Sequence, residues 1–90
     1  MNYLLVRHKV DDFPSWKEVF DSHAPARREA GLRVERVLRN TDNPSEVILL
    51  YSAVSLQKAR EFMTHPDAHE AKRQSGVIDE PDVYFLTEGA

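Results

Sequence analysis

Apolar and polar residues alternate at the start of the chain, and this pattern predicts a β-strand. Side chains alternate between the two sides of a strand. One side would carry Leu4, Val6, His8 and Val10, and the other Tyr3, Leu5, Arg7 and Lys9. Because both sides begin with apolar or aromatic residues, we expect this strand to lie in the centre of a sheet.

A helix follows, and its apolar residues mark one face. They lie at the i, i+3, i+4, i+7 spacing of a helix: Trp16, Val19, Phe20 and His23. Asp11 and Asp12 place negative charge before the helix, and Pro14 suits a first turn because its missing N–H is not needed there. The helix is therefore predicted to begin near Phe13 or Pro14.

The same face continues toward Ala30, with one interruption. Pro25 removes a helical hydrogen bond and predicts a kink or a restart between residues 22 and 26. Arg27 is charged at a position where the spacing would also accept an apolar residue. Gly31 is expected to end the helix, since glycine is favoured just beyond the last turn.

Two further strand patterns predict a hairpin. Residues 33–40 carry several charges, which is typical of an edge strand. After a turn at residues 41–44, residues 46–53 form the most strongly β-like run in the chain, so we expect a central strand there.

The last third of the chain predicts a broken helix and a final strand. Ser55 can cap a short helix with apolar positions Leu56, Ala59, Phe62 and Met63. Pro66 is expected to end that helix and to begin a second one, which Gly76 would end. Residues 82–88 would form the last strand, with Tyr84 and Phe85 on opposite faces.

The order of elements is β-α-β-β-α-β, with the second helix split in two. This order predicts an α+β, ferredoxin-like fold over residues 1–90 as a single domain: a four-stranded antiparallel sheet, helices on one face, and the first and third strands in its centre. The other face would also carry many apolar residues. We therefore expect a second copy of the chain to cover it, giving a homodimer.

Composition excludes several classes of partner. The formal net charge is −3 and the pI is about 5.7, which argues against a nucleic-acid partner. The locally basic positions are interleaved with acidic ones and are expected on a solvated face: Arg27, Arg28, Arg33, Arg36 and Arg39. RNA-recognition modules share this element order, but their Gly-aromatic motif is absent and Tyr3 and Tyr51 alone would be available for stacking.

Location and redox chemistry are constrained as well. No apolar run approaches the roughly 20 residues that span a bilayer, so no membrane partner is expected. The first ten residues lack the apolar core of a secretory signal, which leads us to expect a cytoplasmic protein. The chain has no cysteine, which excludes disulfides, thiolate metal sites and cysteine catalysis.

The residue pattern as a whole resembles a known superfamily. The segment VRHKVDDFPSWKEVFDSH, the Gly31 stop, EVILLYSA, SLQKAREFM and DEPDVYFLTE together resemble small members of the dimeric α+β barrel superfamily, near the antibiotic-biosynthesis-monooxygenase-like and cyclase-like proteins. The resemblance implies two ferredoxin-like chains paired through their sheets. It also implies, for some members, cofactor-free oxygenation of aromatic compounds in a pocket between sheet and helices, while other members have different activities.

The candidate site residues lie where such a pocket would be. His8 and His23 are the candidate catalytic residues, since a histidine near neutral pKa can take a phenolic proton. Substrate-binding candidates are Trp16, Phe20, Tyr51 and Phe62. No cofactor is expected, and no metal site, because Pro66 separates the i, i+4 pair His65 and His69.

Each candidate also has a purely structural interpretation. The histidines would then be bonded to backbone groups and the aromatic residues would be ordinary core. The function predicted is a cofactor-independent monooxygenase-like or cyclase-like enzyme on a small aromatic or polyketide-like molecule. The alternative is a non-catalytic dimer of the same fold that binds a small molecule or serves a structural role.

Overall fold

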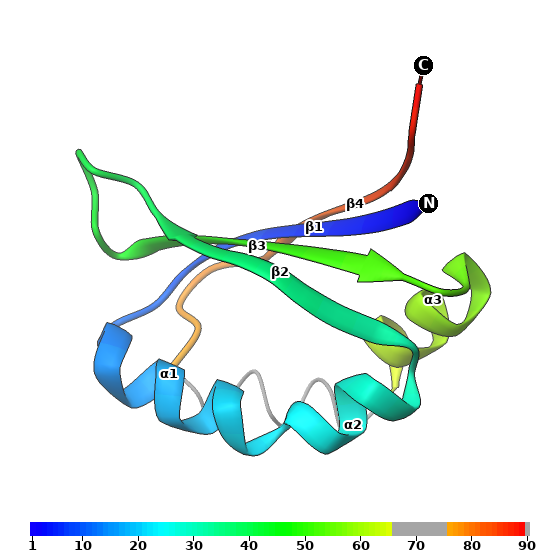
Figure 1. Cartoon of the computed structure of the whole chain (residues 1–90). Helices are drawn as coiled ribbons and strands as arrows, with labels where there is room; N and C mark the ends of the chain where they lie inside the picture. The colour runs from blue at the N-terminus through cyan, green and yellow to red at the C-terminus, as the bar shows by residue number, and fades with distance from the viewer. Residues whose placement is uncertain (66–75, 90) are drawn as a thin grey trace.

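One antiparallel sheet and three short helices make up the described part of the chain (Figure 1). The computed structural model describes residues 1–65 and 76–89. The elements are β1 (Asn2–Lys9), α1 (Phe13–Ser22), α2 (Ala24–Glu29), β2 (Leu32–Arg39), β3 (Glu46–Ala53), α3 (Leu56–Thr64) and β4 (Asp82–Thr87). The predicted helix between Pro66 and Gly76 lies outside the described residues.

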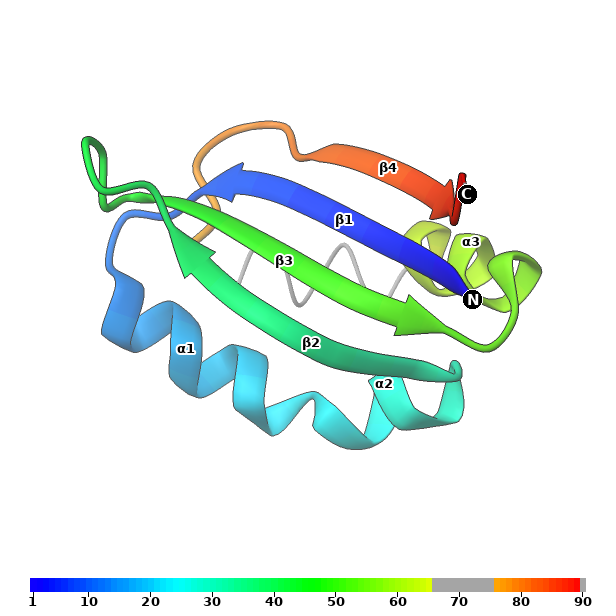
Figure 2. The same ribbon diagram turned by 45° about the horizontal axis from the view of Figure 1, so that its top comes forward.

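The sheet has the strand order β2-β3-β1-β4, so β1 and β3 are central, as predicted. Every neighbouring pair is antiparallel. Figure 2 shows the sheet from its uncovered side, with α1 and α2 beneath it. The predicted α+β, ferredoxin-like fold is confirmed.

The helix boundaries follow from local sequence. Asp12 caps α1 by accepting a hydrogen bond from the Ser15 N–H at 3.1 Å, and hydrogen bonding from the Ser15 side chain and N–H lowers the pKa of the Asp12 carboxyl. The chain then breaks at His23, between α1 and α2, one residue before the first turn that contains Pro25. The predicted restart is confirmed, because proline is accepted where its N–H has no helical partner.

Gly31 turns the chain from α2 into β2. Its φ of 73° lies in the left-handed region, and its carbonyl accepts a hydrogen bond from the Val54 N–H. The hairpin of β2 and β3 contains a register shift between Val34 and Arg36, which marks a bulge in the edge strand.

The core lies between the sheet and the helices. The sheet face that meets the helices is called the inner face here, and its buried side chains are Leu4, Val6, His8, Leu32, Val47, Leu49, Tyr51 and Ala53. Val10 after β1, Trp16 from α1 and Ala59 from α3 complete the buried hydrophobic core. Within residues 1–65 and 76–89, no helix is long and apolar enough to cross a membrane.

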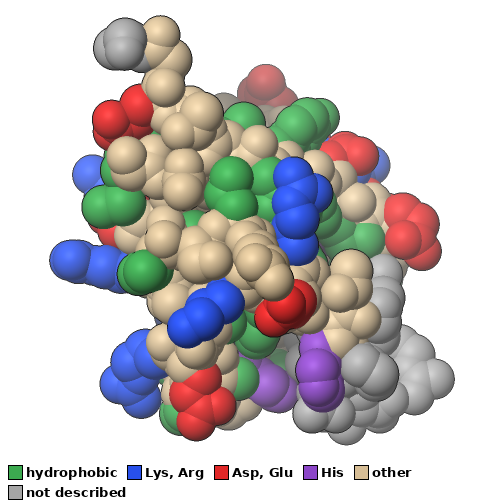
Figure 3. Space-filling model, turned by 90° about the vertical axis from the view of Figure 1, so that its right-hand side faces the viewer, with side chains coloured by type: hydrophobic (Ala, Val, Ile, Leu, Met, Phe, Trp, Pro, Cys, Tyr) green, Lys and Arg blue, Asp and Glu red, His purple; other side chains and the backbone are tan. Residues whose placement is uncertain are grey.

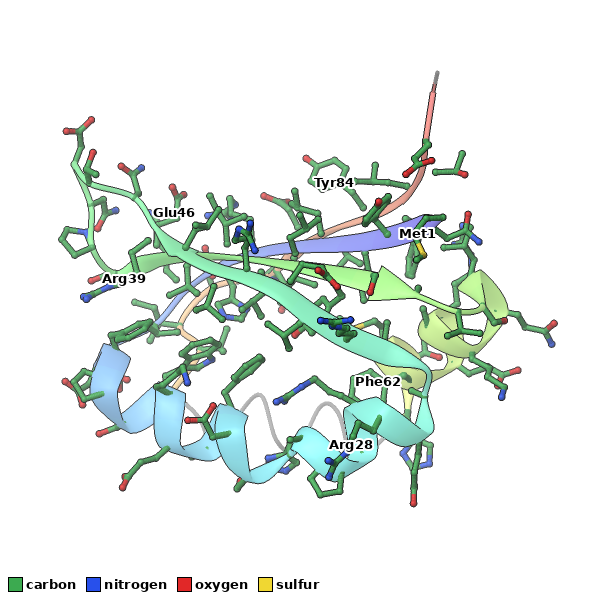
Figure 4. The ribbon with its side chains drawn as sticks, viewed as in Figure 1. Met1, Arg28, Arg39, Glu46, Phe62 and Tyr84 are labelled. Carbon is green, nitrogen blue, oxygen red and sulfur yellow. The ribbon has the colours of Figure 1, made fainter. Side chains whose placement is uncertain are left out.

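The opposite side of the sheet is called the outward face here. Residues paired across antiparallel strands share a face, and the pairs of Leu5 with Leu50 and with Tyr84 place these three residues there. In Figure 4, Tyr84 lies on the side of the sheet away from α1 and α2, whereas Phe62 lies on the helix side. Tyr84 is 53% exposed, and no helix covers this face in the part of the chain described.

Candidate functional site

Three predicted site residues are buried under the inner face, and two of them, His8 and Trp16, are in contact. His8 on β1, Tyr51 on β3 and Trp16 on α1 are each more than nine-tenths buried. The His8 ring lies edge-on to Trp16, with ring centroids 5.5 Å apart. His8 and Trp16 therefore meet between the sheet and α1, whereas Tyr51 lies four residues further along the sheet, opposite Leu4.

The aromatic residues of α1 form a continuous row. Trp16 and Phe20 are stacked, with centroids 4.9 Å apart and an angle of 23° between their planes. Phe13 extends the row at 5.6 Å from Trp16. One turn of helix separates each ring from the next, so the helical spacing itself produces the row.

An arginine lies against each end of the aromatic row. The guanidinium of Arg27, from α2, is 3.8 Å from the centre of the Phe20 ring, and that of Arg39, from β2, is 4.1 Å from the centre of Phe13. Such contacts stabilise a cation through the negative face of the ring. The Nη1 atom of Arg27 also donates a hydrogen bond of 2.7 Å to the carbonyl oxygen of Phe20.

The prediction that Arg27 lies on a solvated face is wrong. Only 6% of its surface is exposed, whereas Arg28, Arg33, Arg36 and Arg39 are exposed as predicted. The reason is its place in the helix: residue 27 continues the stripe of Trp16, Phe20 and His23 toward the core. The position of Arg27 on the apolar stripe indicated burial, but its charge led us to predict that it is exposed to solvent.

Tyr51 lies within electrostatic reach of Arg27. Burial raises the pKa of the Tyr51 hydroxyl above its ordinary value, and the nearby guanidinium offsets only part of that rise. The hydroxyl is therefore protonated at neutral pH and can act as a hydrogen-bond donor. Among the described residues it has no hydrogen-bond partner.

His23 lies at the junction of α1 and α2 and is half-buried. Its Nδ1 is 2.8 Å from the carbonyl oxygen of Val19 and 3.2 Å from the Oγ of Ser22. A carbonyl oxygen can only accept, so Nδ1 carries the proton and the neutral ring has its lone pair on Nε2. The geometry thus selects the ring nitrogen that could act as a base.

Phe62 approaches the core from α3 and is partly buried against it. Its ring makes no stacking contact with Trp16 or Phe20 in the described part of the chain. The three predicted aromatic residues therefore divide into a stacked pair on α1 and a separate ring on α3.

No group of three or more His, Asp or Glu residues within 1–65 and 76–89 is arranged to hold a metal ion. His65 is exposed just after α3, and His69 lies outside the described residues. The chemistry that the inner layer does offer is proton transfer at imidazole, hydrogen bonding from Tyr51, and binding of flat rings.

Comparison with known proteins gives a clear result for the fold. No protein-family model matches the sequence, and no curated protein matches it either. Solved structures do match: a candidate antibiotic biosynthesis monooxygenase from Bordetella bronchiseptica has a TM-score of 0.79 at 14% identity, covering 99% of this chain and 97% of that one. SnoaB, a cofactor-independent oxygenase from Streptomyces nogalater, has a TM-score of 0.73 at 14% identity, with 99% and 93% covered.

A third similar structure has no assigned activity. An uncharacterised NIPSNAP domain protein from Burkholderia xenovorans matches with a TM-score of 0.68 at 9% identity, covering 100% of this chain and 96% of that one. Identities this low establish shared architecture and leave function open. By its strand order, its helices and these matches, the chain has the fold of the antibiotic-biosynthesis-monooxygenase-like proteins.

Proposed function

We propose that the protein is a homodimeric, cofactor-independent enzyme of the monooxygenase or cyclase type. Its substrate would be a small aromatic or polyketide-like molecule bound between the sheet and the helices. The observation that carries the proposal is the buried His8 ring edge-on to Trp16, with buried Tyr51 and Arg27 further along the same largely apolar core. Few convergent polar groups in apolar surroundings are the usual form of a small-molecule site.

The aromatic residues would bind the substrate. Trp16 and Phe20 already form a stacked pair, and a flat ligand ring can pack against such a surface. Phe62 would contact the ligand from α3, and the Tyr51 hydroxyl would donate a hydrogen bond to a ligand oxygen. These four residues supply shape and orientation, and none of them needs to change its charge.

The histidines would move the proton. In this scheme His8 or the Nε2 atom of His23 takes the proton from an electron-rich phenol whose keto tautomer has a ring methylene, and the resulting anion reacts with O₂ at that carbon. One oxygen atom becomes a carbonyl on a ring methylene, and the other leaves as water with the two methylene hydrogens. The carbonyl oxygen comes from O₂ and the electrons come from the substrate, so the reaction needs no further reductant.

The outward face supports the homodimer. Its apolar residues are only partly covered by their own chain, and Leu38 and Tyr84 are about half exposed. Figure 3 shows that the flank of the molecule at the α3 end carries side chains of both charges, with hydrophobic groups between them. In a twofold-symmetric dimer, the outward face of a second copy would cover the apolar side chains of this outward face.

Oxygen uptake tests the enzymatic proposal. The protein would be mixed with a dihydroxynaphthalene, and O₂ consumption would be followed with an electrode against a protein-free reaction. His8→Gln removes the buried imidazole, and we expect the turnover rate to fall by roughly 100-fold or more, as for loss of a general base. The matched control is His65→Gln at an exposed position, which should retain the full rate.

The alternative function is a non-catalytic dimer that binds the same class of ligand. It predicts saturable binding of the dihydroxynaphthalene without protein-dependent O₂ uptake. Equal uptake by the unaltered protein and by folded His8→Gln would contradict the proposed role of His8. Circular dichroism of each variant would show that it is folded.

A further inference from the structure

Arg27 is a buried cation with most of its donors unused. Its side chain has five N–H donors, and in the described chain it is buried with only two other polar side chains, His8 and Tyr51. Within residues 1–65 and 76–89 it makes one hydrogen bond, from Nη1 to the Phe20 carbonyl. A buried group of this kind is costly unless something completes its hydrogen bonds.

No carboxylate of the described chain neutralises Arg27. The acidic residue that acts on it electrostatically is Asp21, but both carboxylate oxygens of Asp21 accept hydrogen bonds from Lys17, at 2.7 and 2.9 Å. Burial lowers the pKa of Arg27, yet a guanidinium remains charged at neutral pH. Within residues 1–65 and 76–89, the positive charge of Arg27 is therefore not paired directly with a carboxylate.

The surroundings of this charge define what would match it. Arg27 lies over the face of Phe20, which is stacked on Trp16, and the Tyr51 hydroxyl is within its electrostatic reach. A flat apolar surface thus adjoins a cation and a neutral hydroxyl donor. This combination suits a planar ring that carries an anionic oxygen group.

We propose that Arg27, assisted by Tyr51, recognises the anionic oxygen of a planar aromatic ligand, either a carboxylate or an ionised phenol. The proposal rests on the proposed function in placing a ligand between sheet and helices, and it adds the charge of that ligand. A carboxylate would accept two parallel hydrogen bonds from the guanidinium fork. An ionised phenol would offer one oxygen to the same donors.

A charge kept for a ligand leads to a specific expectation for how removing Arg27 changes the stability of the fold. A buried charge kept for the fold should be costly to remove, whereas a buried charge kept for a ligand should be costly to retain. Arg27→Met preserves length and apolar contact while removing the charge. In chemical denaturation we therefore expect its unfolding midpoint to equal or exceed that of the unaltered protein, as for the control Arg28→Met at the exposed neighbour.

Binding is tested with two probes of the same shape and different charge, 2-naphthoate and 2-naphthamide. Trp16 is the only tryptophan, so its fluorescence reports directly on the layer beside Arg27. We expect 2-naphthoate to bind roughly 10- to 100-fold more tightly than 2-naphthamide, as for one charge-assisted hydrogen-bonded pair. Arg27→Met should abolish that preference and retain 2-naphthamide binding, while Arg28→Met should keep the preference.

The outcomes separate this inference from the proposed function. Equal affinity for the two probes, or a preference that survives in Arg27→Met, would overturn the anion inference while leaving an aromatic site intact. Binding of neither probe would contradict both proposals. A strong loss of stability in Arg27→Met alone would assign the residue to the fold and overturn the inference.

A third probe identifies the source of the anionic oxygen. At pH 8 free 2-naphthol is mostly neutral, and its ionised form has a distinct absorption band at longer wavelength. Appearance of that band on binding, and its loss in Arg27→Met, would support recognition of an ionised phenol. If 2-naphthoate binds with the expected preference and the naphthol band does not appear, the carboxylate is the recognised group.

Discussion

The two faces of the sheet carry similar apolar residues in different surroundings. On β3, Leu49 points to the inner face and is 3% exposed, while its neighbour Leu50 points outward and is only partly covered. The inner face has helices against it, and the outward face has none in the described part of the chain. The comparison shows that the sequence provides apolar residues on both faces, although helices pack against only one of them in the described part of the chain.

The two faces also differ in the hydrogen-bond partners that they provide for an arginine. On the outward face, Arg7 donates to Asp82 at 2.7 Å, to Glu46 at 2.9 Å and to Asp79 at 3.3 Å. Under the inner face, Arg27 meets a ring and a single carbonyl. The first arginine is matched by three carboxylates, whereas the second is bonded to no carboxylate among the described residues.

The largest expected effect concerns the inner face. Leu49→Ala would leave a cavity in the core and should lower the free energy of unfolding by about 2–5 kcal/mol. Leu50→Ala should cost less, and its cost should grow with protein concentration if the outward face is an interface. Urea unfolding at two protein concentrations measures both; equal, concentration-independent losses would contradict the distinction between the faces.

The second effect concerns assembly. Leu50→Arg places a charge in the centre of the outward face, and burying it unpaired should weaken a dimer by roughly 100-fold or more. Sedimentation equilibrium would then show a monomer for Leu50→Arg and a dimer for the unaltered protein. Glu18→Arg, on the exposed side of α1, is the control and should remain a dimer. An unaltered protein that is monomeric in dilute solution would contradict the dimer outright.

The smallest effect is the acid response of the Arg7 cluster. Hydrogen bonds from the Lys9 N–H and from Arg7 lower the pKa of Asp79, and those from Asn40 and Arg7 lower the pKa of Glu46. Depressed folded-state values mean that these carboxylates stabilise the fold above their ordinary pKa values of 3.8 and 4.5, and that this contribution is lost as pH falls below them.

The variant Asp79→Asn tests whether the charge of Asp79 contributes to the stability of the fold. We expect it to lower the urea midpoint at pH 7 and to change it less at pH 3, so the difference between the two pH values should shrink. Asp42→Asn, in the exposed loop between β2 and β3, should leave that difference unchanged. A variant that loses equal stability at both pH values would show that Asp79 acts through its backbone hydrogen bond without regard to its charge.

Much of the fold could be predicted because it depends on local pattern. The period-two alternation of β1 separated Leu4 and Leu5 onto opposite faces of the sheet, and Asp12, Pro25 and Gly31 marked the ends of helices. These signals act over a few residues and need no knowledge of distant partners. The central positions of β1 and β3 followed from the order of elements.

The rest depended on long-range placement. The three carboxylates around Arg7 come from β3, from the segment before β4 and from β4 itself, so only the strand register brings them together. The helical spacing of Arg27 indicated its burial, but the general expectation that charged residues are exposed led to the opposite prediction. The roles assigned to His8 and His23 stay predictions.

The central position of β1 has a consequence for folding kinetics. Its hydrogen bonds on one edge go to β3 and on the other to β4, where Asn2 pairs with Thr87. Closing so long a loop is entropically slow, so folding should belong to the slower class of small domains. Until Asp82–Thr87 pairs with β1, one edge of β1 has unpaired backbone groups, and a second partly folded chain could pair with it there.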